Sequence, residues 1–310
     1  MHTLISAFLY ASLAALICVV FAVTFPRLHP LVDLLAQFLF AAIVGAALIA
    51  VFAALMGRPM IAAAAGVVLL AALALGWPWL QAPSARHAEG PRFTLMSFNV
   101  YYYNRSLDRA VALIRAKRPD ILVLLEVIPE VRPGLSALET DYPYRVECWR
   151  ERPCDALIFS RFPLTDISVE LPEPTFRRPL GAVRTEIDGR PLTVFAAHLS
   201  LPYPLDPRAR QPGEIEAIST AIASIQGPRV MSGDFNAATW GATMSALRER
   251  TGMEILTGVG GTWPTFLPRH LGIPIDHVMA SDDLVMRTRE VINVPGSDHR
   301  AVVTEIAFKK

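Results

Sequence analysis

The chain has 310 residues, 53% of them hydrophobic, and carries 29 basic against 28 acidic side chains. Only three arginines and two acidic residues precede residue 91, which leaves 26 basic and 26 acidic residues in the remainder. A domain without net charge lacks the basic surface expected of a strong nucleic-acid binder, although a local basic groove stays open. Residues 93–310 suffice for a single domain with one sizeable core.

Three apolar runs occupy the N-terminal block, at residues 4–24, 31–56 and 60–80. Each run reaches the length of about 20 residues that a helix needs to cross a hydrocarbon core of roughly 30 Å. A cleavable signal peptide is the alternative for the first run, but no Lys or Arg precedes it. We therefore expect residues 1–80 to form an anchor of three transmembrane helices, followed by a polar linker at residues 81–92.

Two signals about the side of the membrane oppose each other. Three arginines on the domain side, against one arginine and the terminal amine on the other, mildly favour a cytoplasmic domain. Cys148 and Cys154, however, bracket a short polar loop, and this spacing suggests a disulfide in an oxidising compartment. Two unrelated thiols are the alternative. On balance we expect the domain on the extracytoplasmic side.

The remainder of the chain alternates between helix and strand patterns. Helices are predicted at 106–118, 213–226 and 242–250. Apolar runs predict strands at 92–100, 120–127, 155–164, 182–200, 229–237, 274–281 and 301–308. The range 182–200 holds two strands, which Asp188 and Gly189 join in a hairpin. Because hairpins exclude a purely parallel sheet, we expect an α/β fold with two mixed sheets and helices outside them.

Polar side chains recur where these apolar strands begin or end. They are Asn99, Glu126, His198, Asp234, Asn236, Asp276, Asp298 and His299. One such residue alone is most simply a turn former, but in a sandwich of sheets the strand ends can converge on one rim. Carboxylates are hard oxygen ligands suited to Mg²⁺. With amides and two histidines, they can activate water and stabilise the transition state of phosphoryl transfer.

Other catalytic motifs are absent from the sequence. No Cys/His cluster has the spacing of a zinc site, no glycine-rich nucleotide loop is present, and no serine lies on a nucleophile elbow. The segments "SFNV", "LLEV", "AAHLS", "SGDFNA", "IDHVMAS" and "GSDHRAV" follow one another in this order. Together they strongly resemble the endonuclease/exonuclease/phosphatase superfamily, over about residues 93–308. The resemblance implies a four-layer α/β sandwich and phosphoester hydrolysis with Mg²⁺, or Mn²⁺ in its place.

The same resemblance implies a metal site. Glu126 resembles the principal Mg²⁺ ligand of the superfamily, with Asn99 beside it. Asp298 is expected to reach this metal or a second one. Leu125 departs from the glutamine that commonly precedes the glutamate.

The resemblance also implies the catalytic roles. Asp234 is similar to the carboxylate that positions or deprotonates the attacking water, and Asn236 to the amide that holds a phosphate oxygen. His198 resembles a histidine that donates to the phosphate. His299 would contact the phosphate as acid or base, with Asp276 orienting its ring. Asp155 is either a further site residue or a turn former, and we favour the turn former. His277 is expected to be a structural residue that faces away from Asp276.

The substrate depends on the anchor. Three spans before the domain, together with "GTWPTF" and "GIPIDHV", resemble a bacterial membrane-anchored subgroup that includes the VanJ-type teicoplanin-resistance proteins. An anchor favours a substrate in the membrane, because tethering raises the effective concentration. Trp263, Phe266 and the "YYYN" segment at 101–104 are candidates for a lipid-facing mouth, although ordinary packing is expected for at least two of the three tyrosines. We expect a phosphohydrolase of a phospholipid or lipid carrier. The alternatives are a nuclease acting on DNA or RNA, and a non-enzymatic module with a relic site.

Overall fold

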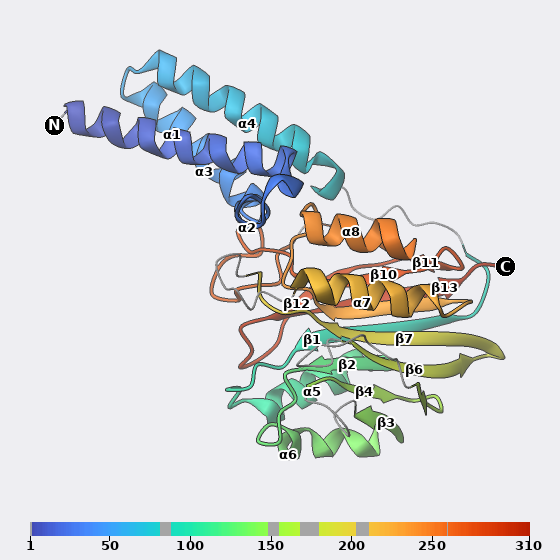
Figure 1. The fold of residues 1–310 in the computed structure, drawn as a ribbon. Helices are drawn as coiled ribbons and strands as arrows, with labels where there is room; N and C mark the ends of the chain where they lie inside the picture. Colours follow the sequence, from blue (N-terminus) through green and yellow to red (C-terminus); the bar gives the residue numbers. More distant parts are fainter. Residues whose placement is uncertain (1, 81–87, 148–154, 168–179, 203–210, 259) are drawn as a thin grey trace.

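The N-terminal helices of the computed structural model form a bundle that leans against one edge of an α/β domain (Figure 1). The structure describes residues 2–80, 88–147, 155–167, 180–202, 211–258 and 260–310. The predicted disulfide between Cys148 and Cys154 lies outside the described residues, as does most of the predicted linker.

The bundle agrees only in part with the expected three transmembrane helices. Helices α1 (His2–Thr24) and α4 (Pro59–Leu80) are long and apolar enough to cross a membrane. The run at 31–56 is not one helix, because it divides into α2 (Pro30–Ala36) and α3 (Leu39–Leu55), which are bent by 60°. At 1.5 Å per residue, the 17 residues of α3 reach only about 26 Å. The described helices therefore offer two candidate spans, or three if the bent pair counts as one.

The first sheet contains the first and last strands of the α/β domain. Its order is β11-β13-β1-β2-β4-β3, with β12 pairing β13 beside this path. The two central strands, β1 (Arg92–Asn99) and β2 (Ile121–Leu125), run parallel, and the other pairs are antiparallel. The remaining strands are β3 (Tyr144–Glu147), β4 (Leu157–Ser160), β11 (Leu284–Met286), β12 (Glu290–Asn293) and β13 (Arg300–Phe308).

The second sheet has the order β5-β6-β7-β8-β10-β9. Its parallel pair is β7 (Arg190–His198) with β8 (Arg229–Asp234), and β10 (Asp276–Ala280) runs antiparallel to β8. The predicted hairpin joins β6 (Leu180–Ile187) to β7, with Asp188 and Gly189 both at positive φ, as a type I′ turn requires. The edge strands are β5 (Thr165–Asp166) and β9 (Glu254–Ile255). The prediction of two mixed sheets is thus confirmed.

Apolar side chains fill the space between the sheets and cover both outer faces. Leu95, Val123, Val194 and Val278 lie in the cluster between the sheets. Helices α5 (Leu107–Lys117) and α6 (Arg132–Leu135), with the short η2 (Ser136–Thr140), contribute to a second cluster on the outer face of the first sheet. Helices α7 (Gln211–Ala223) and α8 (Ala242–Thr251) contribute to a third on the second sheet. The central strands therefore bury both of their faces, whereas edge strands such as β3 and β5 remain partly or fully exposed.

The bundle also packs directly against the α/β domain. Ala36, Leu39 and Phe40 share one buried cluster with Trp240 and Ile275. The short η1 (Pro26–Leu28) adds an exposed ion pair, between Arg27 and Glu249 of α8. The bundle is thus held by a defined interface as well as by the chain that joins it to β1.

Candidate active site

Three adjacent strands of the second sheet place three site residues side by side. His198 ends β7, Asp234 ends β8, and Asp276 begins β10. Asp234 is the direct partner of His198 in the parallel pair of β7 and β8. It is also the direct partner of Asp276, since β10 runs antiparallel to β8 and therefore begins where β8 ends. Gly233 permits this approach, since a Cβ there would lie 1.9 Å from the carbonyl oxygen of Ala197. The glycine of "SGDFN" is therefore required by the contact between β7 and β8.

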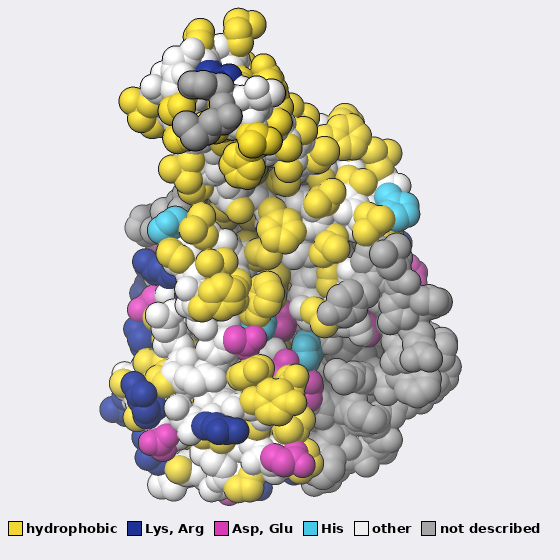
Figure 2. All heavy atoms as spheres, turned by 90° about the vertical axis from the view of Figure 1, so that its left-hand side faces the viewer, with side chains coloured by type: hydrophobic (Ala, Val, Ile, Leu, Met, Phe, Trp, Pro, Cys, Tyr) yellow, Lys and Arg dark blue, Asp and Glu magenta, His cyan; other side chains and the backbone are white. Residues whose placement is uncertain are grey.

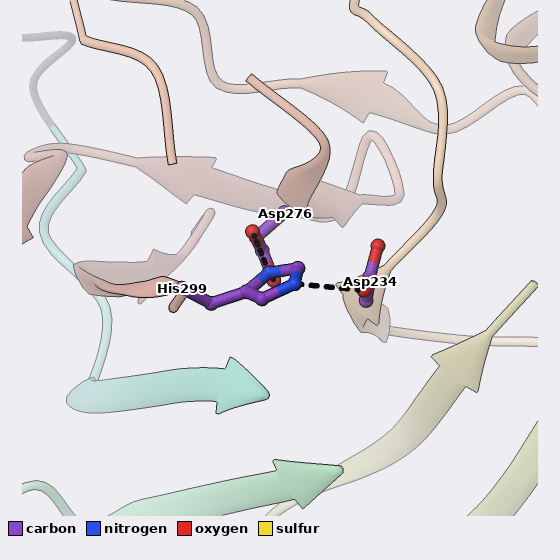
Figure 3. A group of neighbouring side chains, drawn as sticks. All are labelled: Asp234, Asp276 and His299. Atoms are coloured by element: carbon purple, nitrogen blue, oxygen red, sulfur yellow. Dashed lines mark hydrogen bonds and ion pairs between the residues drawn. The ribbon is translucent and has the colours of Figure 1, made fainter. Parts of the chain in front are cut away.

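His299 reaches this row from the other sheet, one residue before β13 (Figure 3). Its Nδ1 lies 3.0 Å from Asp276 Oδ2, and its Nε2 lies 3.7 Å from Asp234 Oδ2. All three side chains are buried. The pairing of His299 with Asp276 that we expected is present in the structure, and it orients the imidazole toward Asp234.

A second histidine–aspartate pair approaches Asp234 from the opposite side. His198 Nδ1 lies 2.9 Å from Asp155 Oδ2, and its Nε2 lies 3.9 Å from Asp234 Oδ2. Asp155 precedes β4 of the first sheet, so this pair also joins the two sheets. The expectation that Asp155 is only a turn former was wrong. Its signal in the sequence was an acidic residue just before an apolar strand, the same pattern that identified its neighbours.

The charges of this cluster shift several pKa values. Burial by itself lowers the pKa of His299, but Asp276 and Asp234 more than offset it, and the pKa rises to about 10. For His198, burial again lowers the pKa, and Asp155 raises it to about 9. Burial, followed by the charge of Asp276, raises the pKa of Asp234 to about 6, although both histidines act in the other direction. Both imidazoles are therefore protonated at neutral pH when no cation is bound.

Glu126 and Asn99 are further residues that the first sheet contributes to the site. The amide nitrogen of Asn99 donates to Glu126 Oε1 at 2.8 Å and to Asp234 Oδ2 at 3.3 Å. Its oxygen accepts the backbone N–H of Tyr101, and the backbone N–H of Tyr102 donates to Glu126 Oε2. Glu126 follows β2 with a positive φ of 58°, which is rare for a glutamate and turns its side chain from the strand direction. Asn99 thereby links the carboxylates of the two sheets.

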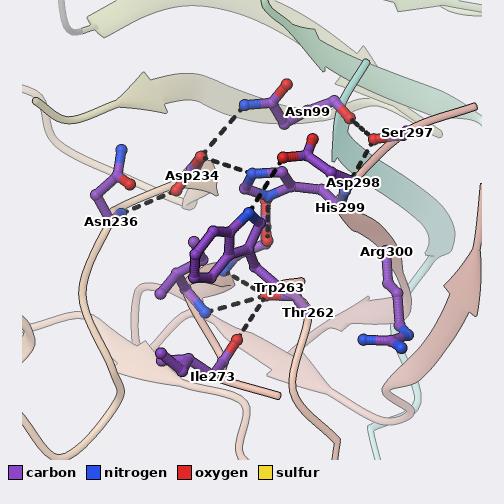
Figure 4. A network of polar contacts seen from close by, with 12 residues as sticks. Asn99, Asp234, Asn236, Thr262, Trp263, Ile273, Ser297, Asp298, His299 and Arg300 are labelled. Atoms are coloured by element: carbon purple, nitrogen blue, oxygen red, sulfur yellow. Dashed lines mark hydrogen bonds and ion pairs between the residues drawn. The ribbon is translucent and has the colours of Figure 1, made fainter. Parts of the chain in front are cut away.

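Asp298 lies next to His299 and faces Trp263 (Figure 4). Trp263 Nε1 donates to Asp298 Oδ2 at 3.2 Å, whereas Asp298 Oδ1 is buried and has no hydrogen-bond partner among the described residues. Ser297, which the sequence reasoning did not single out, joins this turn to β1. Its hydroxyl donates to the backbone oxygen of Asn99 at 2.7 Å and accepts the N–H of His299 at 3.0 Å.

Arg300 and Thr262 hold the loop that carries Trp263. The guanidinium of Arg300 donates to the backbone oxygens of Gly261, Pro264 and Thr265, among others. The hydroxyl of Thr262 accepts the backbone N–H of Asp276 at 3.0 Å. Both residues lie outside the predicted site, although Thr262 belongs to the segment "GTWPTF" and Arg300 to "GSDHRAV".

Asn236 follows Asp234 in a tight turn with a φ of 49°. Its backbone N–H donates to Asp234 Oδ1 at 2.9 Å, and its side-chain amide donates to the oxygen of Leu199. His277 is buried and its Nε2 donates to the oxygen of Ala237 at 2.8 Å, in agreement with the structural role expected of it. Burial lowers its pKa to about 4, so the ring is neutral. His277 therefore braces the segment that follows β8.

The donor set fits a divalent cation. Asp234, Asp276 and His299 each offer one atom, and these atoms lie within 4.8 Å of one another. Glu126 and Asp298 add carboxylate oxygens, and the buried Oδ1 of Asp298 lacks a partner among the described residues. Oxygen donors of this kind suit Mg²⁺ or Mn²⁺ rather than zinc. A cation would also offset the repulsion between neighbouring carboxylates.

Exposed aromatic side chains lie on the two segments that contact Glu126 and Asp298. Tyr102 and Tyr103 are exposed, Phe266 is 83% exposed, and Trp263 lies at the rim beside Asp298. We had expected at least two of the three tyrosines to be packed, and this was wrong for Tyr102 and Tyr103. In Figure 2 the acidic and histidine side chains lie in a hollow between hydrophobic side chains, which continue upward to the helical bundle. We call Tyr102, Tyr103, Trp263 and Phe266 the aromatic rim.

Comparisons with solved structures agree with this fold. An endonuclease/exonuclease/phosphatase from Beutenbergia cavernae is 20% identical, with a TM-score of 0.57, and the match covers 71% of this chain and 72% of that one. D. rerio TDP2 in complex with a single-strand DNA product matches at 15% identity and a TM-score of 0.57, over 69% and 98% of the two chains. Beta toxin from Staphylococcus aureus matches at 18% identity and a TM-score of 0.51, over 70% and 100%. At these identities the likeness concerns the fold alone.

No curated protein was found to match this chain. The model of the Endonuclease/Exonuclease/phosphatase family matches residues 96–299. That stretch begins inside β1 and ends at His299, so it includes every residue of the cluster around Asp234. The chain therefore belongs to the endonuclease/exonuclease/phosphatase family and is a metal-dependent phosphoester hydrolase.

Proposed function

We propose that this hydrolase cleaves a phosphoester or pyrophosphate of a membrane lipid or lipid carrier, with Mg²⁺ as its cofactor. One observation supports this substrate class above the others. Two residues of the aromatic rim contact the site, because Tyr102 donates its backbone N–H to Glu126 and Trp263 donates to Asp298. The hydrophobic side chains of this face continue to the helical bundle (Figure 2). Tyrosine and tryptophan favour the boundary between lipid and water, because their rings are apolar and their polar atoms can stay hydrated.

The cation would be held by Glu126 and Asp298, with Asn99 beside them as the predicted third ligand. His299 is less suited to ligation, because its Nδ1 faces Asp276 and its Nε2 faces Asp234. When bound, the cation supplies Lewis-acid polarisation of a phosphoryl oxygen and neutralises developing charge. Calorimetric titration of Mg²⁺ tests this assignment. We expect Glu126→Gln to weaken Mg²⁺ binding at least about tenfold and His299→Ala to change it little. The reverse pattern would place the cation at the cluster of Asp234, Asp276 and His299.

The protein residues divide the chemistry between them. Asp234 Oδ2 is flanked by two imidazoles, which leaves it in position to orient an attacking water and to accept its proton. His198 and His299 donate from Nε2 to the oxygens of the phosphoryl group, and His299 can deliver a proton to the leaving oxygen. Asn236 holds a further phosphate oxygen. Asp276 and Asp155 keep Nδ1 of each ring protonated, so that Nε2 faces the reacting group.

A direct assay separates lipid from nucleic acid. The purified full chain in mixed micelles, supplied with Mg²⁺, is expected to release the phosphorylated headgroup or phosphate from phospholipid or polyprenyl pyrophosphate. Glu126→Gln and Asp234→Asn should abolish the release. Intact lipids together with cleaved single-stranded DNA would refute the lipid assignment.

A nuclease is the second candidate, because one structural relative is seen with a single-strand DNA product. The balance of 26 basic and 26 acidic residues after residue 90 counts against it, since phosphate backbones are bound chiefly by excess positive charge. Plasmid nicking that disappears in Glu126→Ala would support the nuclease.

We also propose that the chain is a multi-pass protein of a bacterial cytoplasmic membrane, of the VanJ-like subgroup, with its domain on the extracytoplasmic side. If α1, the bent pair and α4 each cross the membrane, the N-terminus and the domain lie on opposite sides. If only α1 and α4 cross, they lie on the same side. A reporter fused after Lys310 that is active only outside the cytoplasm tests this orientation. Activity of a cytoplasm-specific reporter would contradict it.

A further inference from the structure

The surface where the bundle meets the α/β domain includes the segment that connects β8 to α8, residues 235–241. This segment contains both Asn236 and Trp240. Trp240 is 6% exposed and packs edge-on against Phe40, with ring centroids 4.9 Å apart. Its Nε1 donates to the backbone oxygen of Ala36, the last residue of α2, at 2.6 Å. The membrane bundle thus buries a residue four positions from Asn236.

Asp33 makes the second contact of this kind. It is the only acidic residue among the first 80. Its Oδ1 accepts the backbone N–H of Ala242 at 2.6 Å, at the first turn of α8. The N-cap position of α8 is Gly241, which has no side chain to satisfy these amides, and a Cβ there would lie 2.8 Å from Asp33 Oδ1. Asp33 therefore supplies, from another part of the chain, the cap that α8 lacks.

A carboxylate in an apolar helical segment needs a compensating partner, because removing it from water is costly. The partner is the N-terminus of α8, whose free amides and helix dipole favour a negative charge. The two hydrogen bonds both come from α2, and Phe40 at the start of α3 adds the ring contact with Trp240. At this bend of 60°, α2 turns away from the direction of α3 and lies on the domain.

We infer that Asp33 and Trp240 form a clamp through which α2 positions residues 235–241, and with them Asn236. Hydrogen bonds extend the clamp to the site. Thr243, in the first turn of α8, donates to Gln211 Oε1 at 3.2 Å, and Gln211 Nε2 donates to the oxygens of Ser200 and Phe235. On the opposite side, His277 holds the oxygen of Ala237. The segment is therefore fixed from the domain by His277 and from the bundle by α2.

Asp33 and Trp240 are positioning residues under this inference, because they contact no reacting atom. The effect on catalysis rests on the proposed role of Asn236, whereas the effect on the segment itself does not. Two measurements on the full chain in detergent micelles keep these apart. One is hydrogen–deuterium exchange of peptides covering residues 235–242. The other is hydrolysis of bis(p-nitrophenyl) phosphate with Mg²⁺, with kcat and KM determined separately.

For Asp33→Ala we expect exchange in the segment to rise about tenfold and kcat/KM to fall about tenfold, because small displacements of a positioned group are costly. Asp33→Asn should bring both the exchange rate and kcat/KM close to their wild-type values, since its amide oxygen still accepts the backbone N–H of Ala242. Glu249→Gln is the matched control: it removes the exposed ion pair with Arg27 at the same interface and should change either quantity less than twofold. Trp240→Phe keeps an aromatic ring but loses the hydrogen bond to the backbone oxygen of Ala36. Its exchange rate and its kcat/KM should therefore lie between those of Asp33→Ala and those of the control.

A double variant tests the route. If Asp33 acts through Asn236, Asp33→Ala should reduce kcat/KM little in an Asn236→Ala background, because the two losses share one cause. Full additivity would show that Asp33 does not act through Asn236 and would overturn this route. Unchanged exchange in Asp33→Ala would overturn the clamp while the hydrolase assignment stands. Raised exchange in a protein whose wild type hydrolyses no phosphoester would support the clamp and refute the proposed function.

Discussion

The two histidine–aspartate pairs approach the same atom from opposite sides and differ in their exposure to water. His299 and Asp276 are 7% and 1% exposed, whereas His198 and Asp155 are 14% and 23% exposed. In each pair one residue belongs to each sheet, and the histidine Nε2 faces Asp234 Oδ2, at 3.7 and 3.9 Å. Water screens the second pair more, so its carboxylate holds the charge on its ring less strongly. The two pairs therefore share a geometry, but we expect them to contribute unequally to catalysis.

His299→Ala is expected to have the largest effect and to lower kcat by about 10³-fold, because it removes the proton donor of the drier pair. Hydrolysis of bis(p-nitrophenyl) phosphate with Mg²⁺ measures this. His270→Ala, at an exposed histidine outside the site, is the control and should be neutral. A kcat within tenfold of wild type would remove His299 from the reaction.

His198→Ala is expected to lower kcat by about 10²-fold, less than the equivalent change at His299. The reason is that His198 donates from a wetter position, where water can replace part of its interaction with the phosphoryl group. The same assay compares the two variants directly. A larger loss at His198 than at His299 would reverse the ranking of the pairs.

Asp276→Asn should lower kcat by about 50-fold, because the amide keeps the shape but no longer stabilises a protonated His299. The pH dependence of kcat should change as well, since the ring loses its main charge partner. Thermal unfolding of the variant shows whether the loss reflects catalysis. A fall in kcat matched by extensive unfolding at the assay temperature would assign Asp276 to stability instead.

Asp155→Asn is expected to have the smallest effect, a loss of about tenfold in kcat. Asp155 is the most exposed of the four residues, and water can partly substitute for its carboxylate. In a His198→Ala background the substitution should cost nothing further, because its only role in the proposal is to orient that ring. An additional loss there would show a separate function for Asp155, such as contact with substrate.

Much of the site follows from the sequence, because strand ends and residue chemistry are local properties. "SGDFNA" predicts a buried strand that ends in a carboxylate, and the structure places Asp234 at the end of β8. "GSDH" predicts a turn before the last strand, and Gly296 indeed adopts a φ of 80° there. The pattern of apolar runs likewise predicted two mixed sheets. These features need only the periodicity and turn preferences of short segments.

The partners of these residues do not follow from local patterns. Asp155 meets His198 only because β4 and β7, in different sheets, bring their ends to one rim, and a single acidic residue before a strand cannot show this. The exposure of Tyr102 and Tyr103 was misjudged for a related reason, since an aromatic run is packed or exposed according to what lies opposite it.

What the sequence by itself determined is which residues can perform phosphoester chemistry and where each stands along its strand. The tertiary structure alone decided which of these residues face each other. It also decided that the run at 31–56 bends and that Asp33 contacts the first turn of α8, 209 positions later in the chain. The physical reason is the range of the interactions. Periodicity and turn chemistry act over a few residues, whereas pairing between sheets and docking of the bundle depend on contacts between segments distant in the chain.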